Sequence, residues 1–183
     1  MKKTILVFGL ISGVLSSLMM VTTVPFIDKI GHDKGYYIGY TAIVLSFLLV
    51  FFGIRSYRDN VGHGQITFAK GFAVGICITL ISCVFYVLTW EALYFTVLHD
   101  FMDKYSAYVI EKLRASGANA AAVQAKLQEM KKFKEMYENP FFNAAMTFIE
   151  PFPVGLGITL LSAAILRKKP QTQLAQSPLP ASR

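Results

Sequence analysis

The chain has 183 residues, of which 54% are hydrophobic and only 16% are charged, and its mean hydropathy is +0.48. The composition is not that of an ordinary soluble domain. A formal charge of +7 would suit a nucleic-acid-binding protein, but the basic residues lie beside apolar runs and no nucleic-acid recognition motif is present. Orientation in a membrane and attraction to anionic lipid explain the basic excess more simply.

Four apolar runs are long enough to cross a bilayer, because about 20 helical residues span a hydrocarbon core of about 30 Å. We predict an all-α integral membrane bundle within residues 1–169, with four transmembrane helices at about 4–27, 36–54, 71–98 and 141–166. The first run resembles a secretory signal, but its apolar part is too long and no A-x-A site follows, so we expect it to remain as a span. Residues 170–183 are rich in Pro, Gln and Ser, which predicts a disordered cytoplasmic tail.

The mostly polar stretch at about 99–138, between the third and fourth spans, is predicted to form an extramembrane helical hairpin. Apolar residues recur at three- and four-residue spacing in its first half, and its second half is rich in strong helix formers. The segment SGAN between them supplies a glycine stop and polar capping residues. Helical spacing does not separate a solvated hairpin from a cap over the bundle or a docking surface for a partner.

Lysine and arginine set the expected orientation. Nine basic residues and one acid fall on the side of the termini and the middle loop, against nine basic residues and eight acids on the other side. The rule counts basic residues rather than net charge, so the tally is a tie. The positions of the basic residues decide the orientation, because the short segments that flank the spans on the first side are dense in lysine and arginine. We therefore expect a multi-pass protein of a bacterial inner (cytoplasmic) membrane with both termini cytoplasmic.

Two acids lie within the outer parts of spans, and intramembrane acids are functional candidates by default. Glu91 lies near the end of the third span, and Glu150 lies about 25 Å along the helix from Arg167, so both are expected at comparable outer depth. One interpretation is that both acids anchor the outer ends of the bundle. The other is a polar site at Glu91 and Glu150 that holds a proton, a cation or a headgroup amine. Pro151 and Pro153 predict a bend near Glu150.

Small residues in two spans predict close helix packing, within the chain or between copies. They are Gly9 and Gly13 in the first span, and Gly71 and Gly75 in the third. Cys77 and Cys83 are six residues apart on one helix, which is too far for a disulfide, and we interpret them as packing residues.

Three basic residues stand in the middle loop: Arg55, Arg58 and Lys70. They are candidates for contact with lipid phosphates or with a cytoplasmic partner, and the alternative is that they only anchor the chain on the cytoplasmic side. His99 and Asp103 have the spacing of two metal ligands, but an exposed helix face is the simpler interpretation. We predict no metal, no cofactor and no catalytic residue, since no nucleophile, base or phosphate-binding motif is visible.

Three stretches together resemble one membrane-protein family over roughly residues 1 to 170. They are GQITFAKGF at the start of the third span, WE near its end, and EPFPVGL at the start of the fourth. The chain is similar to the domain of unknown function 4199 family. The resemblance implies a bacterial four-helix integral membrane protein with no assigned activity, in which Glu91 and Glu150 are family features.

Two functions are consistent with these features. The first is a non-enzymatic structural, accessory or interaction protein whose partners are membrane lipids and a second copy or another membrane protein, with no nucleic acid. The second is a small transporter or a proton- or cation-binding protein that uses Glu91 and Glu150.

Overall fold

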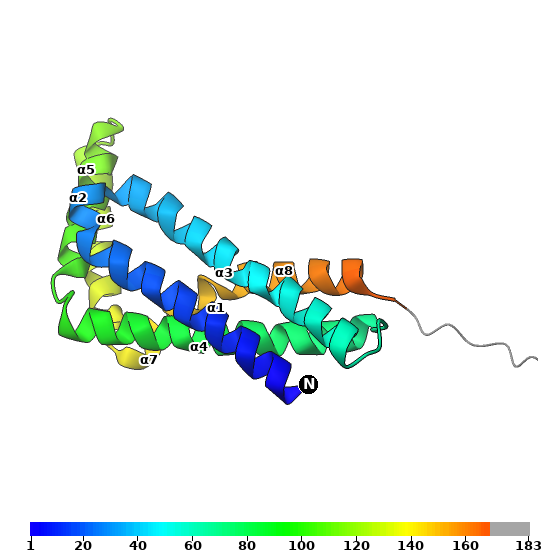
Figure 1. Cartoon of the computed structure of the whole chain (residues 1–183). Helices are drawn as coiled ribbons and strands as arrows, with labels where there is room; N and C mark the ends of the chain where they lie inside the picture. The colour runs from blue at the N-terminus through cyan, green and yellow to red at the C-terminus, as the bar shows by residue number, and fades with distance from the viewer. Residues whose placement is uncertain (169–183) are drawn as a thin grey trace, which may run out of the picture.

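The computed structural model describes residues 1–168, and the predicted tail at 170–183 lies outside them (Figure 1). Every regular element of residues 1–168 is helical, apart from one isolated bridge between Ile66 and Lys168. In chain order the helices are α1 (Lys2–Thr23), η1 (Val24–Phe26), α2 (Ile27–Ile30), α3 (His32–Asn60), α4 (Phe68–Thr96), α5 (Phe101–Ala115), α6 (Ala120–Tyr137), α7 (Pro140–Ile149) and α8 (Phe152–Leu166).

Four segments are long and apolar enough to cross a membrane: Lys2–Phe26, His32–Asn60, Phe68–Thr96 and Pro140–Leu166. The prediction of an all-α chain with four such segments is therefore confirmed. The second segment begins at His32 rather than near residue 36, because the loop that we expected between the first two spans is mostly helical. Only Gly31, with a φ of 91°, interrupts the helices there.

Local sequence explains where the helices after the third span begin. The side chain of Asn119 accepts a hydrogen bond from the Ala122 amide at the start of α6, and Asn139 accepts one from the Phe141 amide at the start of α7. Asparagine is a favoured residue at this position because it satisfies amides that have no partner within the helix. Pro140 follows Asn139 as the first helical residue, where its missing amide costs nothing.

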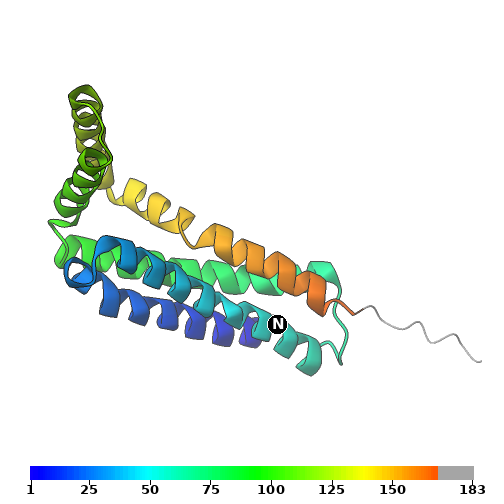
Figure 2. The same cartoon turned by 90° about the horizontal axis from the view of Figure 1, so that it is seen from above.

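α4 lies at the centre of the bundle and packs against α1, α3, α7 and α8 (Figure 2). The glycines singled out in the sequence lie at contacts between helices of the same chain. A Cβ on Gly9 or Gly13 of α1 would lie 3.0 Å or less from Ile81 or Phe85 of α4. On α4, a Cβ on Gly75 would lie 2.7 Å from Thr159 of α8, whereas one on Gly71 meets Ala163 at an ordinary 3.4 Å. An added Cβ would therefore force a neighbour to shift at Gly13 and Gly75, would be a tight fit at Gly9, and would be accommodated at Gly71.

α5 and α6 lie across one end of the bundle, which we call the α5–α6 end (Figure 1). A cluster of buried residues joins them to α1 and α4: Met20, Trp90, Tyr94, Met102, Met130 and Tyr137. A second contact ties α5 to the start of α3, where Asp33 Oδ1 accepts hydrogen bonds from Tyr108 Oη at 2.6 Å and Lys112 Nζ at 2.9 Å. The ring of His32 stacks on Tyr108 beside it.

The opposite end of the bundle holds the chain start, the α3–α4 loop and the end of α8, and we call it the basic end (Figure 1). Backbone hydrogen bonds between Ile66 and Lys168 join the loop to the residues after α8. Above this end the core is made of aliphatic side chains with no exposed surface: Val50, Ile54, Val74 and Ile78. The half of the bundle near the basic end is therefore tightly closed.

Candidate functional site

The fourth span is broken at Glu150, between α7 and α8. Pro151 has no N–H to donate to the Thr147 carbonyl, and Pro153 has none to donate to the Ile149 carbonyl, so two helical hydrogen bonds cannot form here. The helix resumes when the Gly155 amide donates to the Pro151 carbonyl at 3.0 Å. The bend that the sequence predicts is therefore present, and it places Glu150 about 15 Å along α7 from Pro140.

The carboxylate of Glu150 turns toward the bundle interior, where it contacts α4. Tyr86 Oη donates a hydrogen bond to Glu150 Oε2 over 2.9 Å. Three phenols, from α3, α4 and α6, lie within electrostatic range of Glu150: Tyr40, Tyr86 and Tyr137. Within residues 1–168, no lysine, arginine or histidine pairs with this carboxylate. Glu150 is thus a partly buried acid with a phenol as its partner and no compensating cation.

Glu91 does not share this site. It follows Tyr86 by five residues on α4, which turns it about 140° around the helix and lifts it about 7 Å toward the α5–α6 end. Its Oε1 is buried and has no hydrogen-bond partner. The structure therefore pairs Glu150 with Tyr86 and does not join the two carboxylates in one hydrogen-bonded site.

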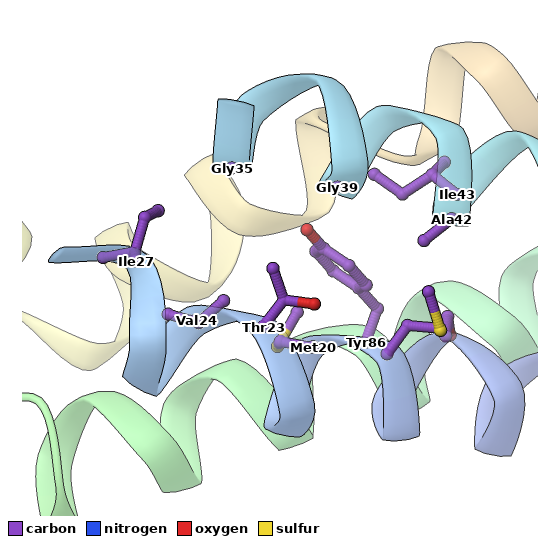
Figure 3. A pocket seen from close by; sticks show the side chains of 11 residues that line it. Met20, Thr23, Val24, Ile27, Gly35, Gly39, Ala42, Ile43 and Tyr86 are labelled. Carbon is purple, nitrogen blue, oxygen red and sulfur yellow. The ribbon is translucent and has the colours of Figure 1, made fainter. Parts of the chain in front are cut away.

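Next to Tyr86 lies a cavity of about 50 Å³ between α1 and α3 (Figure 3). Ile27 and Gly35 line it toward the α5–α6 end, and Ser16 and Ile43 line it deeper in the bundle. The hydroxyl of Tyr86 points into the space between α1 and α3 (Figure 3). A smaller cavity of about 10 Å³ continues from it and shares Ser16, Ile43 and Tyr86, and its other walls include Ser46, Ser82 and Pro151.

A second polar cluster fixes α7 against α4. Trp90 Nε1 donates to Asn143 Oδ1 at 2.8 Å, and Thr147 Oγ1 bonds the same oxygen at 3.2 Å. Asn143 Nδ2 in turn donates to the Tyr137 carbonyl, and the Asn143 side chain has no exposed surface. Asn143 was not among the residues singled out from the sequence. The feature of the sequence that could have identified Asn143 is its place inside the apolar run of α7, because a buried side-chain amide requires hydrogen-bond partners.

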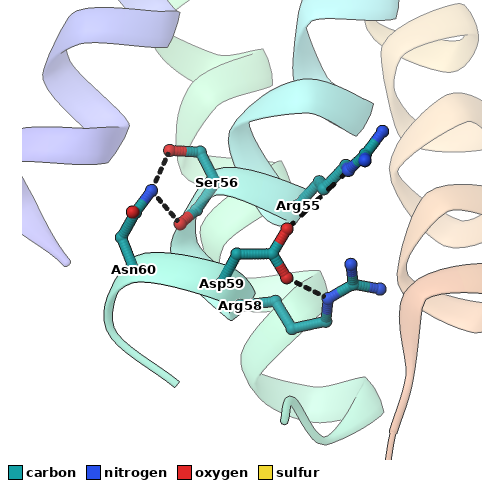
Figure 4. Close-up of polar contacts among 5 residues, drawn as sticks. All are labelled: Arg55, Ser56, Arg58, Asp59 and Asn60. Atoms are coloured by element: carbon teal, nitrogen blue, oxygen red, sulfur yellow. Dashed lines mark hydrogen bonds and ion pairs between the residues drawn. The ribbon is translucent and has the colours of Figure 1, made fainter. Parts of the chain in front are cut away.

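Arg55 and Arg58 lie in the last two turns of α3, at the basic end of the bundle (Figure 4). Arg58 Nε donates to Asp59 Oδ1 at 2.7 Å, and Arg55 lies 3.7 Å from the other oxygen of the same carboxylate. Lys70 is exposed in the first turn of α4. The three residues are therefore distant from Glu150, and two of them share one acid.

At the α5–α6 end, Asp103 bonds Lys134 at 2.6 Å, and His99 is exposed. Among the residues that the structure describes, no group of three His, Cys, Asp or Glu side chains is placed to hold a metal ion.

Comparison with known proteins gives one match. No curated protein and no solved structure is significantly similar to this chain. Residues 7–168, which include all four candidate spans almost completely, match the family described as "Protein of unknown function (DUF4199)". The matched segment contains the bend, Glu150 and Tyr86. The chain therefore belongs to the DUF4199 family.

Proposed function

We propose that this chain spans a bacterial inner membrane four times and takes up and releases a proton at Glu150. The observation that carries the proposal is the hydrogen bond of 2.9 Å between Tyr86 and Glu150 at the bend between α7 and α8. An ionised carboxylate is expensive within a bilayer and is normally paired or functional. Here its partner is a neutral phenol, so a proton is the simplest species that compensates its charge.

The ligand set favours a proton over a divalent metal ion. Calcium is held by six to eight oxygen ligands, and magnesium requires near-octahedral coordination. Among the side chains of residues 1–168, only that of Tyr86 is in hydrogen-bond contact with Glu150. The proposed step is a simple protonation of the carboxylate, with no covalent chemistry and no cofactor, so the proposed protein is not an enzyme.

The proposed topology places both termini in the cytoplasm and α5 and α6 outside, as a helical hairpin. Support comes from the basic residues at the basic end of the bundle: Lys2, Lys3, Arg55, Arg58 and Lys70. Retention of such residues on the cytoplasmic side is the strongest sequence rule for orientation. A reporter that is active only in the cytoplasm, fused to either terminus, is expected to be active, and the same reporter inserted between α5 and α6 is expected to be silent. The opposite pattern would reverse the topology.

Proton transfer is tested in liposomes that contain the purified protein and an entrapped pH-sensitive dye. A potassium gradient with valinomycin supplies the driving potential. We expect a pH change faster than in protein-free liposomes, and we expect Glu150→Gln to abolish the difference, because glutamine accepts the Tyr86 hydrogen bond but binds no proton. Glu91→Gln is the matched control and should retain the flux.

Equal rates for the wild type and Glu150→Gln would reject the proposal. A flux that disappears when sodium is replaced by choline at constant pH would assign a sodium ion, rather than a proton, to the site.

A second candidate is an accessory protein that docks through α5 and α6. The observation that favours it is a set of exposed apolar side chains outside the four candidate spans: Tyr105, Leu127 and Met136. A second copy of the chain or another membrane protein would cover them, while lipid would cover the spans. Cross-linking from Leu127→Cys in native membranes should then give a discrete larger species, and a lone monomer would count against this candidate.

A further inference from the structure

The cavity between α1 and α3 leads from the α5–α6 end of the bundle toward Glu150. We infer that it holds water, and that water reaches the Tyr86–Glu150 pair from this end alone. The functional importance of this water rests on the proposed function, because the water would be the route by which a proton reaches Glu150. The position of the water in the bundle can be tested independently of proton transfer.

The dimensions of the cavity suit water. One buried water needs roughly 10–15 Å³ of such space and two to four polar partners. The larger cavity, at about 50 Å³, therefore has room for about three to five waters. Its polar lining comes from Ser16, Thr23 and the hydroxyl of Tyr86. The smaller cavity, at about 10 Å³, has room for about one water at most.

A buried serine at the smaller cavity supplies independent support. Ser46 lines this cavity, is 1% exposed, and has no hydrogen-bond partner for its hydroxyl. A buried hydroxyl without a partner is costly, and an ordered water is the usual solution. Pro151, the residue directly after Glu150, lines the same cavity. A water between Ser46 and Tyr86 would therefore lie beside the residue that follows Glu150.

The route stops toward the basic end. Below Ser46 on α3 come Val50 and Ile54, which have no exposed surface, and Val74 and Ile78 of α4 close the same level. These aliphatic side chains offer water no hydrogen bond. α4 and α8 also approach too closely there for a passage, since a Cβ on Gly75 would lie 2.7 Å from Thr159. Access is thus one-sided in this conformation.

Gly39 of α3 is the residue that leaves the route open. It lines the larger cavity, and a Cβ built on it meets no atom within 4 Å (Figure 3). A leucine at this position therefore fits without an initial clash, and because Gly39 forms part of the cavity wall we expect the larger side chain to narrow the cavity. Gly157 of α8 also has no atom within 4 Å of an added Cβ, and it does not line either cavity. Gly157→Leu is therefore a matched control.

Radiolytic hydroxyl-radical footprinting with mass spectrometry tests the route, because the radicals form from water in place and oxidise the adjacent side chains. In the wild-type protein in nanodiscs we expect oxidation of Tyr86, while Ile54 and Val74 remain unmodified. Gly39→Leu should abolish the oxidation of Tyr86, and Gly157→Leu should leave it unchanged. If Gly39→Leu does not fold, Gly39→Ala serves instead and should reduce the oxidation without abolishing it.

An unmodified Tyr86 in the wild type, or equal oxidation in the Gly39 variants and the control, would overturn the inference. Glu150→Gln separates it from the proposed function, because this variant should lose proton flux in liposomes and keep the oxidation of Tyr86. Normal footprinting without any flux in the wild type would reject the proton function and still support the water route.

Discussion

Gly155→Ala is expected to loosen the contact of α8 with α3 and α4. The added Cβ would lie 2.5 Å from Thr79 Cγ2 and 2.9 Å from the ring of Phe47. Neither neighbour moves easily, because both are almost completely buried and the Thr79 hydroxyl contacts Thr159 Oγ1 at 3.0 Å. α8 must therefore shift outward to accept even one methyl group.

The magnitude follows from three opposing effects. Overpacking costs about 1–3 kcal/mol, and loss of a hydrogen bond between helices in a membrane costs about 0.6 kcal/mol. Alanine is favoured over glycine inside a helix by about 1 kcal/mol. The net destabilisation expected for Gly155→Ala is about 0.5–2.5 kcal/mol. Gly157→Ala, with no atom within 4 Å of its Cβ, should instead gain up to about 1 kcal/mol.

Unfolding by sodium dodecyl sulfate in mixed micelles measures the difference. Trp90 is the only tryptophan of the chain and is buried where α4 contacts α7, so its fluorescence reports the loss of packing. The midpoint for Gly155→Ala should lie below that of the wild type, and the midpoint for Gly157→Ala at or above it. Equal midpoints for the two variants would refute the close contact at Gly155.

Two further changes have defined outcomes. Asn143→Ala leaves the Trp90 indole N–H without its acceptor and should lower the free energy of unfolding by about 1–3 kcal/mol in the same assay. The control is Asn60→Ala, which removes an exposed hydrogen bond and should change stability by less than about 0.5 kcal/mol. Similar effects of the two variants would contradict the role of Asn143. The pKa of Lys112 is raised by its hydrogen bond to Asp33, by its hydrogen bond to Tyr108 and by the negative charge of Asp33. The contact between Lys112 and Asp33 is therefore intact below the ordinary lysine pKa and is lost as the pH rises through the raised value. An NMR titration of the Lys112 ammonium should show a lower pKa in Asp33→Asn, and an unchanged pKa would mean that α5 does not contact α3 in this way.

Much of the fold was predictable because hydrocarbon imposes a simple requirement on a spanning chain. A segment that must satisfy every backbone group internally and avoid charge has few alternatives to a long apolar helix. The ends of the helices were less predictable, because the helical backbone hydrogen bonds continue past the ends of the apolar run. α3 continues from His32 to Asn60 through polar residues at both ends, whereas the apolar run predicts only about 36–54.

The site was predictable only in part. Pro151 and Pro153 mark the bend, and an acid in an apolar run marks Glu150. The partner of that acid was not visible, because Tyr86 lies 64 residues earlier and meets it only through the packing of α4. Counting residues along each helix estimates depth but not rotation, so it could compare Glu150 with Glu91 and could not reveal the contact with Tyr86.

The two halves of the bundle differ in how tightly they are built, and the site lies at their boundary. Toward the basic end the walls are fully buried aliphatic side chains and glycine contacts, which have little room to move. Toward the α5–α6 end lie the ends of α1 and α3, with the larger cavity between them, and α7, which the bend at Glu150 separates from α8. Both α3 and α7 are tied there to α5 and α6, through Asp33 and through the Asn143 bond to the Tyr137 carbonyl. A force that displaces α5 and α6 therefore acts on the cavity wall and on the helix that leads to Glu150 at the same time.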